Sequence, residues 1–156
     1  MPSVVATIPD QRRLRDAEQR LLDAVHAHMR RPFAWGVADC CTWAFDAVQA
    51  VTGVDPIADV RGTYGTRWQA MRVLWRLGGM RALLDARLPA RVPDRGVLQH
   101  GDVGLVPGGL CVGGPMLVGA LAVWWRGVWV AQGADGLVTL AHDVLHPVRP
   151  YWRAGL

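Results

Sequence analysis

The sequence predicts an α+β domain in which N-terminal helices pack on an antiparallel sheet built from the C-terminal half. Apolar side chains recur at helical spacing before Pro89, whereas short segments rich in Val, Leu and Trp, separated by Gly, Asp or Pro, follow His100. Helices followed by strands, without alternation, are typical of this class. A chain of 156 residues is the size of one domain with its own core. We therefore expect a single domain over 1–156, with a helical part at about 10–88 and a β-rich part at about 101–156.

Four helices are expected in the helical part. Asp10 and Thr66 are placed to cap two of them, Gly53 suits a left-handed C-terminal cap, and Pro32 ends the first helix. His26 and His28 are expected to be solvated. The helices cover 10–30, from Asp39 or Cys40 to Gly53, from Thr66 to Gly78, and 80–87, with inward stripes of Leu14, Ala17, Leu21, Val25 and Met29 in the first and Trp68, Met71, Leu74 and Trp75 in the third.

The β-rich part is expected to form an antiparallel meander of five short strands, at 102–106, 116–125, 127–132, 136–140 and 148–153. Within it, 103–125 carries no formal charge and is long enough to cross a bilayer. Pro107, Pro115 and two Gly-Gly pairs interrupt that segment and favour two buried strands joined by a Gly-rich loop. We expect no stable membrane insertion.

Composition argues against several classes of protein. Apolar residues make up 51% and charged residues 19%, which argues against disorder. The net charge is +4, but the 17 basic residues are all Arg, spread along the chain and interleaved with Asp, so we expect no nucleic-acid partner. The first residues have no basic n-region and only a short apolar stretch, so we expect no secretion signal. Cys40, Cys41 and Cys111 are an odd number of cysteines and imply no disulfide framework.

The most informative segment is 32–41, which reads PFAWGVADCC. Cys40 lies in the first turn of an expected helix, where unpaired backbone N–H groups and the helix dipole stabilise a thiolate, and Asp39 is the cap beside it. Cys40 is therefore a candidate nucleophile. The alternative is that one or both cysteines are small buried apolar residues, Cys41 above all. A zinc set of the three cysteines and one His has poor geometry, because two of them are adjacent and no CxxC pair exists, so we expect no metal and no cofactor.

Several of these motifs resemble those of a known family. Pro-Phe-x-Trp-Gly followed by Asp39-Cys40 at a helix start, and later by Gly101-Asp102 opening a strand, resembles the papain-like NlpC-type cell-wall peptidases. Together with Thr-Gly-x-Asp-Pro at 52–56 and Arg-Gly-x-Tyr at 61–64, the block resembles small phage and prophage proteins encoded near tail-tip genes. The resemblance covers roughly residues 31–140. It implies a papain-like core.

The resemblance also implies site residues. Cys40 would be the nucleophile, and a catalytic His would open the strand after Gly101-Asp102, but 117–122 reads LVGALA and contains no His. Gln132 is the nearest counterpart of the residue that orients this His. His100 and His142 remain candidate bases, with His146 near the last strand. A nucleophile without its base loses about 10² to 10⁴ in rate.

Two functions follow from this resemblance. The first is a structural protein of a phage tail tip or baseplate with a catalytically degenerate peptidase fold; the alternative is an active cysteine peptidase or amidase that cleaves peptidoglycan during phage entry. Either implies a virion protein made in the bacterial cytoplasm, with other tail proteins as partners and peptidoglycan as a further one. Trp124 and Trp125 alternate along a strand, so one of them is expected at an assembly surface or, alternatively, in a Trp-filled core.

Overall fold

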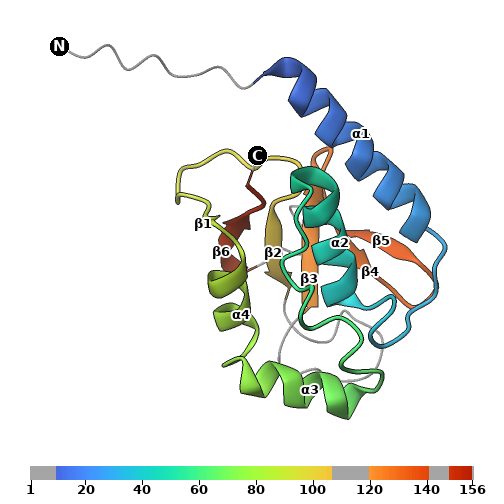
Figure 1. Cartoon of the computed structure of the whole chain (residues 1–156). Coiled ribbons are helices and arrows are strands. Elements are labelled where there is room, and N and C mark those ends of the chain that lie inside the picture. The colour runs from blue at the N-terminus through green and yellow to red at the C-terminus, as the bar shows by residue number, and fades with distance from the viewer. Residues whose placement is uncertain (1–9, 107–119, 141–147, 156) are drawn as a thin grey trace.

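The computed structural model describes residues 10–106, 120–140 and 148–155 and has the expected α+β class (Figure 1). Helix α2 packs on β3 and β4, and α1 packs against α2. A large apolar cluster fills the space between the helices and the sheet. The helices are α1 (Gln11–His28), α2 (Cys40–Thr52), α3 (Arg67–Arg76) and α4 (Met80–Arg87), and the strands are β1 (Ala90–Arg91), β2 (Val103–Val106), β3 (Ala120–Trp125), β4 (Val128–Gln132), β5 (Leu137–Leu140) and β6 (Val148–Arg153).

The helix ends confirm the predicted caps. The side chain of Asp10 accepts a hydrogen bond from the backbone of Arg12, and that of Thr66 accepts one from Gln69. Gly53 closes α2 with φ +77°, the left-handed conformation that glycine adopts without a steric penalty. Caps are local hydrogen bonds between neighbours in sequence, which is why the sequence alone located them.

The inward face of α1 differs from the prediction at both ends. Ala17, Leu21 and Val25 are buried, but Leu14 and Met29 are each more than a third exposed. The prediction of a solvated His28 is wrong, because the end of α1 packs on α2 and leaves this ring only 4% exposed. His28 Nε2 lies 2.8 Å from the Asp46 carboxylate.

The prediction for α3 is also wrong in part. Leu74 is buried as expected, but its buried neighbour is Ala70. Trp68 and Trp75 point to solvent and are 78% and 82% exposed. Helical spacing identifies an apolar stripe, but the four apolar residues predicted for α3 fall on two sides of the helix. Met71 and Leu74 lie on one side, and Trp68 and Trp75 lie on another. Packing against the rest of the protein decides which side is covered.

The sheet is antiparallel throughout, with the order β1-β6-β2-β3-β4-β5. Strands β2 to β5 form the predicted meander. The last strand, β6, does not continue it but returns to the opposite side of β2, where Val103 pairs with Trp152. The two-residue β1, which is too short to show any alternation, pairs with β6 and was not predicted.

Asp102 stabilises the pairing of β6 with β2. The carboxylate is fully buried at the start of β2 and accepts hydrogen bonds from the backbone of Gln99 and Ala154 and from the guanidinium of Arg153. Burial raises the pKa of Asp102, and the donors and the Arg153 charge lower it only in part. Gly101-Asp102, the pair matched in the resemblance, therefore joins β2 to the end of β6.

Strands β2 and β3 occupy the two ends of the charge-free segment 103–125. Both are buried among apolar side chains on either face of the sheet, as the two-strand interpretation predicted. Among the described residues, no helix has the length and apolar content that crossing a bilayer requires. Residues 107–119, with Cys111, lie outside the described part of the chain.

Asp85 gives a prediction of pH dependence. Its carboxylate accepts hydrogen bonds from Arg91 and from the Trp152 indole, which lower its pKa from 3.8 to about 2. Since the folded-state pKa is depressed, the stabilisation is complete above the unfolded value and is lost as the pH falls through about 2. We expect the difference in free energy of unfolding between wild type and Asp85→Asn, measured by urea denaturation, to shrink over this range. A difference that stays constant with pH would contradict the assignment.

Candidate functional site

Cys40 is the first residue of α2, as the sequence predicted. Asp39 is the N-cap, and its side chain and backbone form a reciprocal pair of hydrogen bonds with Thr42, each 2.8 Å long. The segment before it folds back through a backbone bridge between Ala34 and Ala38. This turn presents Cys40 at the positive end of the helix dipole.

The carboxylate of Asp39 joins the two most distinctive motifs of the chain. Its Oδ2 atom accepts a hydrogen bond from the backbone N–H of Gly36, at 2.8 Å, and another from the hydroxyl of Tyr64, at 2.7 Å. Gly36 belongs to the Trp-Gly-x-x-Asp-Cys motif, and Tyr64 ends the Arg-Gly-x-Tyr motif. With Thr42 on Oδ1, three donors converge on one side chain that is 2% exposed.

Charge at this site opposes a thiolate. Burial raises the pKa of Asp39, the neighbouring Cys40 raises it further, and the three donors offset these effects only in part. The repulsion between two negative charges is mutual, so an ionised Asp39 disfavours a thiolate on Cys40. Burial and Asp39 together also raise the pKa of Tyr64, which therefore stays protonated and donates its hydrogen bond.

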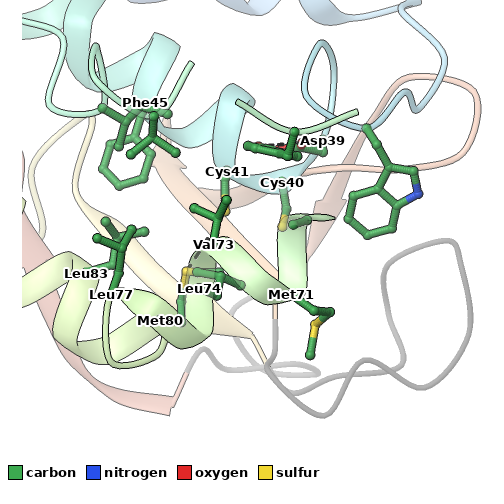
Figure 2. Close-up of a pocket in the computed structure, with 15 residues that line it drawn as sticks. Asp39, Cys40, Cys41, Phe45, Met71, Val73, Leu74, Leu77, Met80 and Leu83 are labelled. Carbon is green, nitrogen blue, oxygen red and sulfur yellow. Dashed lines mark hydrogen bonds between the residues drawn. The ribbon is translucent and has the colours of Figure 1, made fainter. Parts of the chain in front are cut away.

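The space around the two cysteines is a small apolar cavity (Figure 2). Cys40 is 3% exposed, and it packs against Ala120 at the start of β3. The cavity volume is about 30 Å³, which is room for one water molecule. Its lining comes from α2, α3, α4 and the segments before α2 and α3, and comprises Trp35, Asp39, Cys40, Cys41, Phe45, Ile57, Val60, Tyr64, Ala70, Met71, Val73, Leu74, Leu77, Met80 and Leu83.

The described histidines lie elsewhere. His100 precedes Asp102, whose backbone pairs with that of Trp124 at the far end of β3 from Ala120. Trp124 is four positions after Ala120, or about 13 Å along the strand, and the imidazole of His100 lies beside Glu18 of α1. The structure therefore does not bring His100 to Cys40. His142 and His146 lie outside the described residues.

Gln132 lies at the same end of the sheet as Cys40, since the preceding Ala131 pairs with Ala122. The side chain is fully buried, and its amide donates hydrogen bonds to the carbonyl oxygens of Arg31, at 2.8 Å, and Gly133, at 3.0 Å. It thereby holds the chain where it enters the loop that leads to Cys40. The structure gives Gln132 a positioning contact on that loop; its role toward a histidine stays a prediction.

The cysteines are buried in the reverse order of the prediction. Cys41, expected as the more buried one, is half-buried, and its Sγ lies 4.0 Å from Met80 Sδ, whereas Cys40 is the buried residue. Neither forms a disulfide within the described residues. In that part of the chain no group of three or more His, Cys, Asp or Glu side chains is placed to hold a metal ion.

The two adjacent tryptophans of β3 are not the exposed ones. Both are half-buried; Trp124 packs edge-on against the buried Trp129, with ring centroids 5.2 Å apart, and the Arg126 guanidinium covers Trp125. The contact of Trp124 with Trp129 fits the alternative of a Trp-filled core, and an assembly surface at Trp124 or Trp125 stays a prediction.

Tyr64 is the site residue that sequence reasoning missed. Arg-Gly-x-Tyr at 61–64 is one of the motifs that carry the resemblance, but no role was predicted for Tyr64. A tyrosine in a Gly-containing loop next to a helix cap is a usable signal for a buried hydroxyl that needs an acceptor. Its partner, Asp39, lies 25 residues away and became evident only in the fold.

Comparison with known families gives one match. A family model described as a domain of unknown function, DUF6950, matches residues 12–153, which include all of this site. No curated protein matches the chain, and no solved structure matches it.

Proposed function

Since the chain belongs to the DUF6950 family, whose description assigns no function, we propose from its own residues that it is a structural protein of a phage tail tip or baseplate. In this proposal the fold is papain-like and of the NlpC type, and its catalytic chemistry has been lost. The observation that carries the loss is the surroundings of Cys40: a buried carboxylate, a protonated tyrosine and an apolar cavity of about 30 Å³.

Within the described part of the chain, no side chain near Cys40 is placed to supply the two proton transfers that a cysteine peptidase needs. The thiol must lose its proton to a base, and the leaving amine must receive one. Among the described histidines, His28 is held by Asp46, and His100 lies beside Glu18. Asp39 is a poor substitute base, because Gly36, Thr42 and Tyr64 already donate hydrogen bonds to its carboxylate. The helix N-terminus alone supplies neither proton transfer.

The motifs that resemble the peptidases support an architectural role instead. Asp39 links the loop before α2 to the segment before α3, and Asp102 links β2 to β6. Each of these carboxylates is buried and satisfied by several donors. Both carboxylates of the matched motifs thus stabilise the fold here, which fits a protein that keeps the fold and binds neighbouring tail proteins.

Replacing Cys40 tests this proposal. We expect phage particles made with Cys40→Ala to contain the protein and to have the wild-type titre, because in this proposal the thiol takes part in no reaction. Purified wild-type protein should release no peptides from isolated peptidoglycan. Cys41→Ala is the matched control, since Cys41 is the adjacent thiol of the same cavity.

Two results would contradict the proposal in different ways. Purified particles that lack the protein would overturn its place in the tail. Peptide release by wild type that disappears in Cys40→Ala, but persists in Cys41→Ala, would establish the second candidate, an active cysteine peptidase or amidase. The observation favouring that candidate is the position of Cys40 at the start of α2, at the sheet end that also carries Gln132.

A further inference from the structure

Sulfur-containing side chains of the described residues gather at the cavity beside the start of α2. They are Cys40, Cys41, Met71 and Met80. Cys41 Sγ and Met80 Sδ lie 4.0 Å apart, and Cys41 packs against the cluster that contains Cys40. In Figure 2 the Cys41 thiol faces Met80, whereas the side chain of Met71 extends away from the two cysteines. Three sulfurs, two from α2 and one from α4, therefore line one small space.

The separation of the Cys41 and Met80 sulfurs suits a shared metal ion. Metal–thiolate bonds are about 2.3 Å long, and two such bonds that meet at about 120° hold their sulfur atoms about 4.0 Å apart. The distance between Cys41 Sγ and Met80 Sδ has this value. An angle of about 120° is that of a three-coordinate ion, which takes one further donor. Cys40 lies on the wall of the same cavity and supplies that donor.

The types of donor and their surroundings select a soft ion. Thiolates and thioethers favour Cu(I), whereas structural Zn(II) takes four ligands from cysteine, histidine and carboxylate side chains. The described lining of the cavity contains a thioether at Met80 and no histidine. Its volume of about 30 Å³ holds one ion without a shell of water molecules. The cavity therefore suits Cu(I) and does not suit Zn(II).

Charge favours Cu(I) with a single thiolate. Cys41 lies in the first turn of α2, where backbone N–H groups and the helix dipole stabilise a thiolate. A Cu(I) ion bound to one thiolate is a neutral pair, so binding adds no net charge to an apolar cavity. The neighbouring Asp39 disfavours a second thiolate on Cys40, which coordinates as a neutral thiol.

We propose that Cys41, Met80 and Cys40 form a binding site for one Cu(I) ion. On binding, the Cys41 thiol releases its proton to solvent and its sulfur forms a bond with copper. Copper enters and remains as Cu(I), so no electron is transferred. Cys41 is half-buried, which gives the ion access to the site. This site depends neither on peptidase chemistry nor on a place in a phage tail.

Competition for Cu(I) between the full chain and the chromogenic chelator bicinchoninate, in the absence of oxygen, tests the proposal. We expect wild type to take one equivalent of Cu(I) from the chelator. Cys41→Ala and Met80→Leu should each weaken binding at least about tenfold, since a change outside the ligand shell already costs this much. Cys40→Ala should weaken binding less than Cys41→Ala. X-ray absorption at the copper edge should show sulfur neighbours only.

Two variants serve as matched controls. Met71→Leu replaces the thioether that points away from the cysteines, and Cys111→Ala removes the third thiol of the chain; both should bind like wild type. Thermal unfolding without copper establishes that each variant is folded, and Cu(I) should raise the unfolding midpoint of wild type but not that of Cys41→Ala. Absence of Cu(I) binding, unchanged binding by Met80→Leu, loss of binding in Cys111→Ala, or displacement of copper by equimolar Zn(II) would each overturn the proposal.

Discussion

Gly36→Ala is expected to lower the free energy of unfolding by about 3 kcal/mol or more, through strain and overlap combined. Gly36 has φ +75°, a conformation that costs an L side chain about 1–2 kcal/mol. An added Cβ would lie 2.1 Å from the carbonyl oxygen of Tyr64, so the two backbone segments would have to separate. That separation weakens both hydrogen bonds on Asp39 Oδ2. Urea denaturation measures the effect.

Gly62→Ala is the matched control for this prediction. Gly62 has the same φ of +75°, but an added Cβ would meet nothing within 4 Å. Its destabilisation should therefore reflect the backbone strain alone, about 1–2 kcal/mol. If the two variants lost the same stability, the close approach of 36 and 64 would not be part of the folded state.

Asp39→Ala should be comparably severe, with a loss of about 3 kcal/mol in the free energy of unfolding. The substitution removes the N-cap of α2, which is worth about 1 kcal/mol, and leaves the Gly36 N–H and the Tyr64 hydroxyl without their acceptor. Each buried polar group left unsatisfied costs about 1–3 kcal/mol. Relief of a buried, partly disfavoured charge offsets some of this cost.

Thr66→Ala is the control for Asp39→Ala, because it removes an N-cap without removing any buried contact. Thr66 caps α3 through one hydrogen bond to Gln69 at an exposed position. Its replacement should cost about 1 kcal/mol, the usual value for an N-cap. Equal losses for Asp39→Ala and Thr66→Ala, each measured by urea denaturation, would mean that Asp39 acts only as a cap and does not join the two motifs.

The parts of the site that depend on residues close together in sequence were predictable. A small polar residue before a helix, a glycine at its end and a cysteine in its first turn are features of consecutive residues, and they located Asp39 and Cys40 correctly. The surroundings of Cys40 were not predictable, because they come from parts of the chain that are distant in sequence. These parts are the segments around Gly36 and Tyr64, the start of β3 at Ala120, and helices α3 and α4. The contacts of Asp39 with Tyr64, and of Gln132 with Arg31, join segments far apart in the chain.

The same division holds for the fold. By itself, the sequence determined the four helices, the N-caps of the first three, the strands from β2 to β6 and the α+β class, because periodicity and capping are properties of neighbouring residues. Only the tertiary structure decided that β6 returns to β2, that His28 is buried and that Trp68 and Trp75 face solvent. Those outcomes depend on which surfaces meet, and an apolar stripe is covered only where another element packs on it.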